Sequence, residues 1–210
     1  MKKFLVSLIL ILFEYINLNH AYVFGKDYTT INKNFIHKKS IIEFFSFICP
    51  YCYNLEKKYN INSNIKKNVS KKIKILKCHV NLLGGEFEKL LTKLWIISVI
   101  KKLEKKIFIP IFEGIQKTHT ITNLSNLKKT FLKLTHINEK EYHLLMNSSI
   151  IKSYIYQQEK LQKLIKLTHV PTILINEKYI INNDIFINKS TKQAIEKYIN
   201  LVKHLLNKNS

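Results

Sequence analysis

Strand-like patterns lie toward the two ends of this 210-residue chain, and helical patterns fill its middle. Short apolar runs bounded by turn residues predict strands, whereas apolar residues that recur every three or four positions predict amphipathic helices. The predicted strands cover residues 22–30, 40–47, 73–82, 172–176 and 178–181. The predicted helices cover residues 54–67, 86–100, 124–134, 142–164 and 194–205. The last two strands predict a hairpin, although Asn176-Glu177 lacks the glycine that tight hairpin turns favour.

Two cysteines stand one helical turn apart where the second strand gives way to the first helix, in the tetrapeptide Cys49-Pro50-Tyr51-Cys52. Two thiols at this spacing can open and close a disulfide. The free N–H groups and the positive dipole end of a helix start stabilise an anion, which lowers a cysteine pKa below its free value of about 8.5. The motif therefore predicts redox chemistry, with Cys49 as the more reactive thiol.

The first 21 residues have the layout of a secretory signal peptide. Lys2-Lys3 precede an apolar stretch at residues 4–13, and a polar stretch then ends at Ala21. The apolar part is too short to span a bilayer comfortably. We expect cleavage after Ala21. A retained N-terminal anchor is the alternative, because Asn19 stands where a small residue is usual.

Export changes how the three cysteines are interpreted. One C-x-x-C pair in an exported protein, without a second pair, favours a redox pair over a zinc site. Cys78-His79 could add two ligands, but adjacent residues in a strand point to opposite faces. We therefore expect no metal and no bound cofactor other than the redox-active disulfide, with Cys78 as a buried and inert residue of its strand.

The formal net charge of +21 comes from 35 basic residues, all of them lysine, against 14 acidic ones. The lysines are spread along the chain, and the same bias toward Ile, Asn, Tyr and Phe is what an AT-rich gene would impose. Nucleic-acid recognition relies on arginine forks and clustered charge, so no nucleic-acid partner is expected. The charge does favour salt-dependent attraction to acidic partners or anionic lipid.

A strand, the C-x-x-C helix and further strands, followed much later by a hairpin and a helix, outline an α/β protein with a thioredoxin fold and an inserted all-helical domain. Within this frame the chain resembles the DsbA family of periplasmic thiol:disulfide oxidoreductases over its whole mature sequence. The predicted thioredoxin-like domain has two parts, residues 22–82 and 159–210, around a helical insertion at residues 83–158. The segments that carry the resemblance are Tyr28-Thr29-Thr30, Glu43-Phe44-Phe45-Ser46-Phe47 before Cys49, His79-Val80-Asn81, Gly84-Gly85, Pro110, Phe112-Glu113-Gly114, Gln116-Lys117-Thr118, Gln157-Gln158-Glu159-Lys160 and Val170-Pro171.

The resemblance implies that the protein donates a Cys49–Cys52 disulfide to newly exported, unfolded proteins in the periplasm. A substrate thiolate would attack Cys49, and the more sheltered Cys52 would close the internal disulfide again. In the family, a quinone-linked membrane protein of the DsbB type carries out the reoxidation. A monomer is expected, because dithiol oxidants of this family usually are monomers.

Pro50 and Tyr51 separate the two cysteines and are expected to tune their redox potential. Tyr51 stands where the family usually has a histidine that helps to hold the thiolate. The family is itself the reference for a potential near −120 mV, whereas glutaredoxins, which share Cys-Pro-Tyr-Cys, lie at about −200 to −230 mV. We expect a partial shift toward the weaker oxidant, because the helix terminus remains.

Val170-Pro171 precedes a predicted strand, where proline is poorly placed for ladder hydrogen bonds. The resemblance implies a cis bond beside the cysteines, with the Val170 backbone offered to an extended substrate as an added strand. A trans turn proline is the alternative. His169, just before Val170, is interpreted as a surface loop residue, with an imidazole near the cysteine pair as the alternative.

Glu43 lies on the same strand face as the apolar residues Ile41 and Phe45. A buried acid without a partner is costly, so Glu43 should be protonated or paired. The resemblance places Glu56 and Lys77 nearby, in a charged cluster beneath the cysteines that would tune proton transfer. The alternative is a strand-end glutamate that reaches water.

Three functions remain open at this point. A disulfide donor to exported proteins is favoured by the signal segment and the helical insertion. A glutaredoxin-like or isomerase-like reductant of the same fold is favoured by Tyr51. A basic, non-enzymatic binding protein for unfolded chains is the third interpretation.

Overall fold

The computed structural model of the chain describes residues 22–31, 39–186 and 190–208. The predicted signal peptide, residues 1–21, lies outside these ranges. Within them, none of the helices has both the length and the apolar character that a membrane crossing requires.

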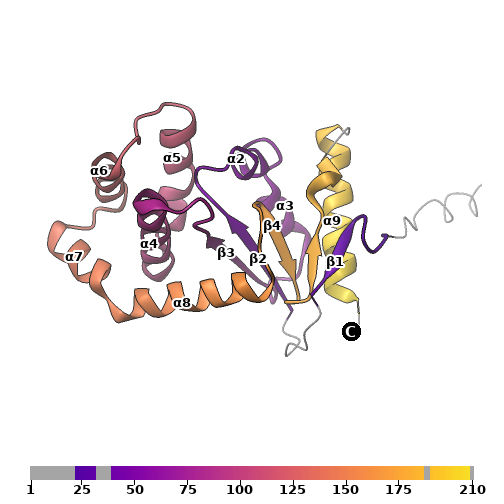
Figure 1. Cartoon of the computed structure of the whole chain (residues 1–210). Helices are drawn as coiled ribbons and strands as arrows, with labels where there is room; N and C mark the ends of the chain where they lie inside the picture. The colour runs from indigo at the N-terminus through magenta and orange to yellow at the C-terminus, as the bar shows by residue number, and fades with distance from the viewer. Residues whose placement is uncertain (1–21, 32–38, 187–189, 209–210) are drawn as a thin grey trace, which may run out of the picture.

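The described strands form one mixed sheet in the order β1-β5-β4-β2-β3 (Figure 1). The interior strand β2 runs parallel to the edge strand β3 on one side and antiparallel to β4 on the other. The β2–β3 register sets Glu43 opposite Lys77, which brings two predicted site residues together through backbone pairing alone. The strands are β1 (Tyr28–Thr30), β2 (Ser40–Phe45), β3 (Lys74–His79), β4 (Thr172–Ile175) and β5 (Tyr179–Ile181).

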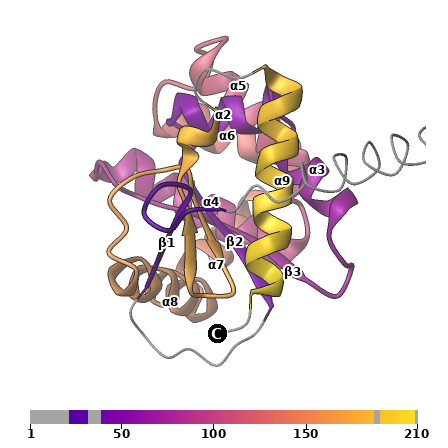
Figure 2. The ribbon, with the colours of Figure 1, turned by 90° about the vertical axis from the view of Figure 1, so that its right-hand side faces the viewer.

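Helices cover both faces of this sheet and also form a separate group beside it (Figures 1 and 2). On one face lie α3 (Ile61–Asn68) and α9 (Thr191–Asn207), while α2 (Pro50–Lys57) starts just beyond the end of β2. The other helices form the group on the left of Figure 1, and the last of them, α8, returns beneath the sheet. They are α4 (Gly85–Lys101), α5 (Glu104–Gln116), α6 (Leu124–Thr135), α7 (Glu139–Asn147) and α8 (Ser149–Leu164).

The strand β2 contributes to three apolar cores, which explains why all six of its residues are buried. Ile41 packs with the residues of α3 and α9, and Ile42 and Phe44 pack on the opposite face with the end of α8. Phe45, with Phe47 beyond the strand, packs into the core of the helical group. Glu43 lies in the middle of this strand and is itself buried, at 1% exposure.

The predicted helix at residues 54–67 is two helices, because Asn60 breaks it. Asn60 has a left-handed backbone with φ of 48°, which asparagine tolerates better than most residues. The break separates α2 from α3 and turns α3 across the face of the sheet. The predicted continuous stretch at 142–164 is also interrupted, at Ser148, which ends α7 and caps α8 by accepting the N–H of Ile150.

The helix α5 was missed by the sequence pattern, because Pro110 lies inside it. Every strand is shorter than predicted, and the first strand shrinks from residues 22–30 to the three residues of β1. The hairpin from β4 to β5 is confirmed, and its turn residues Asn176 and Glu177 both have positive φ, 53° and 54°. The division at residue 158 stays a prediction, and that position lies inside α8.

Candidate redox site

Cys49 caps the N-terminus of α2 with its own side chain. Its φ and ψ of −86° and 113° are those of an N-cap, and its Sγ accepts the backbone N–H of Cys52 at 3.2 Å. Pro50 is the first residue of the helix, where its missing N–H costs nothing. The local sequence thus places one sulfur at the positive end of a helix, as predicted from the motif.

The two cysteines of the motif are free thiols with opposite environments. Cys49 is partly exposed, whereas Cys52 is 1% exposed. Hydrogen bonds from the Cys52 thiol and from the backbone N–H groups of Cys52 and Tyr51 lower the pKa of Cys49. Burial, together with its hydrogen bond to Cys49, raises the pKa of Cys52. Cys49 is therefore the thiol that ionises first and that a solvent molecule or substrate can reach.

The peptide bond between Val170 and Pro171 is cis, which confirms the prediction. Cys49 Sγ lies 3.4 Å from the carbonyl oxygen of Val170, to which its thiol donates. Asn183 Nδ2 donates to the carbonyl oxygen of Pro171 and ties this loop to the segment after β5. The cis-proline loop therefore lies directly against the reactive sulfur.

A hollow of about 450 Å³ opens between the start of α2 and the cis-proline loop. Tyr51, 76% exposed, stands on one side, and His169 and Val170 stand on the other. His169 is exposed, as expected for a loop residue, and it also lines this hollow. The further lining residues are Asn54, Leu55, Lys58, Tyr59, Pro171, Asn183 and Asp184.

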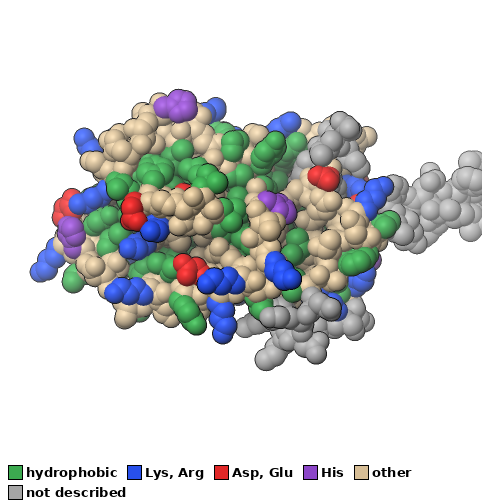
Figure 3. Space-filling view, in the orientation of Figure 1, with side chains coloured by type: hydrophobic (Ala, Val, Ile, Leu, Met, Phe, Trp, Pro, Cys, Tyr) green, Lys and Arg blue, Asp and Glu red, His purple; other side chains and the backbone are tan. Residues whose placement is uncertain are grey.

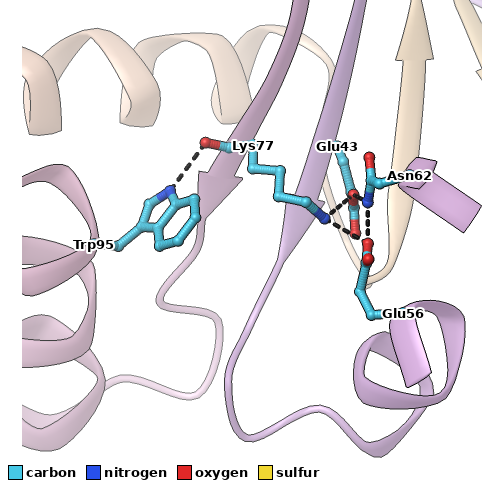
Figure 4. A network of polar contacts seen from close by, with 5 residues as sticks. All are labelled: Glu43, Glu56, Asn62, Lys77 and Trp95. Carbon is cyan, nitrogen blue, oxygen red and sulfur yellow. Dashed lines mark hydrogen bonds and ion pairs between the residues drawn. The ribbon is translucent and has the colours of Figure 1, made fainter. Parts of the chain in front are cut away.

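The predicted charged cluster is present beneath the cysteines, and it contains a fourth member (Figure 4). Lys77 Nζ pairs with Glu56 Oε1 at 2.6 Å and also with Glu43. Asn62 Nδ2 donates to Glu43 Oε2 at 2.7 Å and to Glu56. The indole N–H of Trp95, a residue of α4, donates to the Lys77 carbonyl oxygen at 3.0 Å and so holds the backbone of Lys77.

Burial sets the electrostatics of this cluster. Glu43 is 1% exposed, so the alternative of a strand-end glutamate that reaches water is wrong. Burial raises the pKa of Glu56, against the opposing effect of Lys77. The negative charge of Glu43 raises the pKa of both Cys49 and Cys52, as a smaller effect than the hydrogen bonds and burial. The cluster is therefore coupled electrostatically to the thiols.

Two polar residues that support the loop before Cys49 were not assigned a role from the sequence. His79 Nε2 accepts the N–H of Phe47 at 3.2 Å, and its Nδ1 lies 2.9 Å from Thr92 Oγ1. Complete burial lowers the pKa of His79 to about 3, so the ring is neutral. Gln116 Nε2 donates to the carbonyl oxygens of Phe47 and Cys49 at 2.7 and 3.1 Å. Their separation in sequence from Cys49 hides these contacts from any local pattern.

Cys78 lies on β3 and packs in a different apolar core from Cys52. It is 8% exposed, packs with Ile42 and Phe44, and burial raises its pKa to about 12. The predicted burial of Cys78 is confirmed, and its low reactivity stays a prediction. In the part of the chain that the structure describes, no group of His, Cys, Asp and Glu side chains is arranged to hold a metal ion.

Three features together define a class of protein: a mixed sheet, a C-x-x-C pair at the N-terminus of the helix that follows β2, and a cis-proline loop against the outer sulfur. This class is the thioredoxin-fold thiol:disulfide oxidoreductases, here with a group of helices between the two parts of the fold. Residues 40–194 match the family model of the DSBA-like thioredoxin domain. The chain belongs to the DsbA family of thiol:disulfide oxidoreductases.

Relatives match over nearly the whole length of the chain. This chain is 54% identical over 209 residues to the thiol:disulfide interchange protein DsbA of Buchnera aphidicola subsp. Baizongia pistaciae, and the match covers 99% of both chains. It is 35% identical over 208 residues to DsbA of Escherichia coli strain K12, covering 99% of this chain and 100% of the relative. These relatives agree with the fold and the enzyme class that the sequence predicted.

Solved structures of the family superpose closely on the fold. A DsbA variant of Proteus mirabilis with a non-covalently bound peptide, PWATCDS, matches with a TM-score of 0.80 at 29% identity, covering 89% of this chain and 99% of that chain. DsbA of Klebsiella pneumoniae matches with a TM-score of 0.81 at 28% identity, covering 90% and 100%. The thioredoxin fold with a helical insertion is thereby confirmed.

Proposed function

We propose that Cys49 and Cys52 carry the oxidoreductase activity by donating their disulfide to newly exported proteins, with Cys49 as the sulfur that is attacked. One observation carries this proposal. The exposed sulfur caps a helix and accepts the Cys52 N–H at 3.2 Å, while its partner is 1% exposed. A sulfur that is stabilised as a thiolate is also the better leaving group in thiol–disulfide exchange.

The reaction needs only thiols and disulfides, so its electrons balance without a bound cofactor. A substrate thiolate attacks Cys49 Sγ, the Cys49–Cys52 bond breaks, and Cys52 takes up a proton as it leaves. A second substrate thiolate then attacks the substrate sulfur of the mixed disulfide and releases Cys49 as a thiolate. The substrate loses two electrons and two protons, and the protein gains the two electrons as a dithiol.

The cluster of Glu43, Glu56 and Lys77 is proposed to tune the proton transfers of this cycle. Cys52 must lose a proton each time the internal disulfide closes, and burial opposes that loss. Glu43 acts on both thiols through its charge, and Lys77 and Asn62 hold the two carboxyl groups together. The Glu43→Gln variant should lower the pH midpoint of the Cys49 thiolate absorbance, because a nearby negative charge is removed. An unchanged titration would take Glu43 out of the mechanism.

The hollow between α2 and the cis-proline loop is proposed to hold the substrate as an extended chain along Val170. The Val170 carbonyl oxygen lies against Cys49 Sγ, so a strand added there would bring its own cysteine to the reactive sulfur. The peptide seated on the Proteus mirabilis relative supports a site of this kind. On the face drawn in Figure 3, apolar side chains occupy the upper middle and lysines are scattered among polar groups. Such a surface suits unfolded protein better than nucleic acid.

We further propose a periplasmic location, reached through the signal segment at residues 1–21, and a monomeric enzyme. Reoxidation is assigned to a quinone-linked membrane protein of the DsbB type. Membership of the DsbA family supports these assignments. Finding the protein in the cytoplasm, with Met1 retained, would contradict the periplasmic location.

Trapping of mixed disulfides tests the proposed roles of the two cysteines. In Cys52→Ala, Cys49 should accumulate as a mixed disulfide with exported proteins, because the internal thiol that would displace the substrate is gone. The Cys49→Ala and Cys52→Ala double variant should trap nothing, and Cys78→Ala should behave as the unmodified protein. Trapping that persists without Cys49 would overturn the assignment.

The reductant interpretation of the same fold stays as a second candidate, because Tyr51 replaces the histidine that is usual in the family. The steady-state redox state of Cys49 and Cys52 in the cell separates the two. A mainly oxidised pair supports the disulfide donor, and a mainly reduced pair supports the reductant.

A further inference from the structure

The turn that leads from β2 into α2 is organised by Ser46. Its carbonyl oxygen accepts the N–H of Cys49 at 3.1 Å, and its Oγ accepts the N–H of Ile48 at 3.3 Å. Ser46 is 2% exposed, so these bonds form away from water. They set the backbone that gives Cys49 the extended conformation of an N-cap. The position of the reactive sulfur at the start of α2 therefore depends on how Ser46 is held.

The hydroxyl of Ser46 is held by a buried carboxyl group from α4. Ser46 Oγ donates to Glu88 Oε1 at 3.1 Å, and Glu88 Oε2 accepts the N–H of Leu83 at 2.9 Å. Glu88 is 3% exposed. A buried carboxyl group is costly unless its oxygens accept hydrogen bonds, and here each oxygen accepts one. Glu88 thus joins the loop before α4 to the turn before Cys49.

We propose that Glu88 is a positioning residue of the redox site, which holds through Ser46 the turn that places Cys49 at the N-terminus of α2. The inference rests on the proposed function, since Cys49 is taken as the attacked sulfur. Glu88 touches neither cysteine among the contacts described above, so its effect on them passes through Ser46. Its second oxygen accepts the N–H of Leu83, a residue that is 82% exposed.

A purely structural role of Glu88 would have a different signature. Its bond to the Leu83 N–H holds the loop that leads into α4, and loss of that bond alone would lower the stability of the fold. Its bond to Ser46 is the one that reaches the redox site. The thiolate titration of Cys49 therefore reports the positioning role, and the thermal midpoint reports the structural one.

The test is a titration of the Cys49 thiolate in the reduced protein by ultraviolet absorbance. Burial raises the pKa of Cys78 to about 12, so that residue stays out of the same window. Glu88→Ala should raise the midpoint by about one pH unit, since a misplaced turn costs the thiolate about one hydrogen bond. Glu88→Gln should titrate close to the unmodified protein, because its amide can accept from Leu83 and donate to Ser46. Glu86→Ala is the matched control on the same turn of α4, where the carboxylate is exposed and paired with Lys89.

A double-mutant cycle with Ser46→Ala decides whether Glu88 acts through Ser46. Residues that act through one contact show non-additive effects. Glu88→Ala should shift the midpoint in the unmodified protein and add nothing in the Ser46→Ala background. An equal shift in both backgrounds, or lost thermal stability with no shift at all, would overturn the proposal. Should Glu88→Ala not fold, Ser46→Ala alone carries the same prediction, and an unchanged midpoint there contradicts it.

The failure of this inference can be told apart from failure of the proposed function. If Cys49 traps exported proteins in Cys52→Ala but Glu88→Ala leaves the thiolate midpoint unchanged, the proposed function is supported and the positioning role of Glu88 is wrong. If Cys49 traps nothing, the proposed function falls. The cycle still reports whether Glu88 places the sulfur, because it measures only the thiolate.

Discussion

At the scale of single residues, the redox site depends on an unequal pair of sulfurs. Cys49 is reachable and carries a lowered pKa, while Cys52 is buried and carries a raised one. The hydrogen bond from the Cys52 thiol lowers the pKa of Cys49, with help from the backbone N–H groups at the helix start, and burial raises the pKa of Cys52. Tyr51 adds its backbone N–H to this set, and its side chain points to solvent at 76% exposure.

Tyr51→His should make the protein a stronger oxidant. An imidazole at this position can hold the Cys49 thiolate, which stabilises the dithiol form and favours reduction of the disulfide. The expected change in potential is about 30 mV, or tenfold in the exchange equilibrium with glutathione. Tyr51→Phe is the control and should leave the equilibrium unchanged. A histidine variant no more oxidising than the phenylalanine variant would show that position 51 does not tune the pair.

At the scale of elements, the hairpin between β4 and β5 carries backbone strain at its turn. Asn176 and Glu177 both have positive φ, as the central residues of a type I′ turn do, and the Lys178 N–H closes that turn on the Ile175 carbonyl oxygen at 3.0 Å. Replacing Asn176 would also remove contacts with α9, because its side chain donates to the carbonyl oxygens of Leu205 and Leu206 at the end of that helix. Glu177 makes no such contact with α9 among the hydrogen bonds described, which leaves it as the replaceable residue.

Glu177→Gly should raise the free energy of unfolding by about 0.5–1 kcal/mol. The left-handed backbone costs a residue with a Cβ about 1–2 kcal/mol, and the greater freedom of glycine in the unfolded chain offsets part of that gain. Urea unfolding of the reduced protein measures the change. Glu177→Ala keeps the Cβ and serves as the reference. A glycine variant that is no more stable than the alanine variant would contradict the argument.

Several elements could be predicted from the chain because their causes are local. The cysteine motif, the hairpin and the closing helix follow from short patterns and turn chemistry. The break at Asn60 could not be predicted, since asparagine also occurs inside helices, and Pro110 hid α5 because proline usually ends a helix. In the charged cluster, the strand pattern identifies Glu43, and the family resemblance supplies Glu56 and Lys77, whereas Asn62 and Glu88 were missed. Their hydrogen bonds span 19 and 42 positions, and only the packed fold brings those residues together.

At the scale of the whole molecule, the thiolate of Cys49 links redox state to folding stability. The pKa of Cys49 is lower in the folded dithiol form than the value of about 8.5 for a free cysteine. A group with a lowered folded pKa stabilises the fold fully above its unfolded pKa. That contribution is lost as the pH falls through the folded pKa.

The stability difference between the reduced protein and its Cys49→Ser variant should therefore shrink as the pH falls from about 8.5 through the folded pKa of Cys49. Urea unfolding of both proteins at a series of pH values, under reducing conditions, measures it. The oxidised protein has no Cys49 thiolate, so its own stability should lack this component. A difference that stays constant over the range would mean that the fold does not favour the thiolate.

Transfer of the disulfide from the oxidised protein to a peptide measures whether Cys49 and Cys52 act as a disulfide donor. Oxidised protein is mixed with an equal amount of a reduced, unfolded peptide that contains two cysteines, quenched with acid and weighed by mass spectrometry. Each peptide should lose two hydrogens as each protein gains two, and the protein thiols formed should be Cys49 and Cys52. A peptide that stays reduced beside oxidised protein would show that the pair is not a disulfide donor, as would transfer of equal extent by the Cys49→Ser variant.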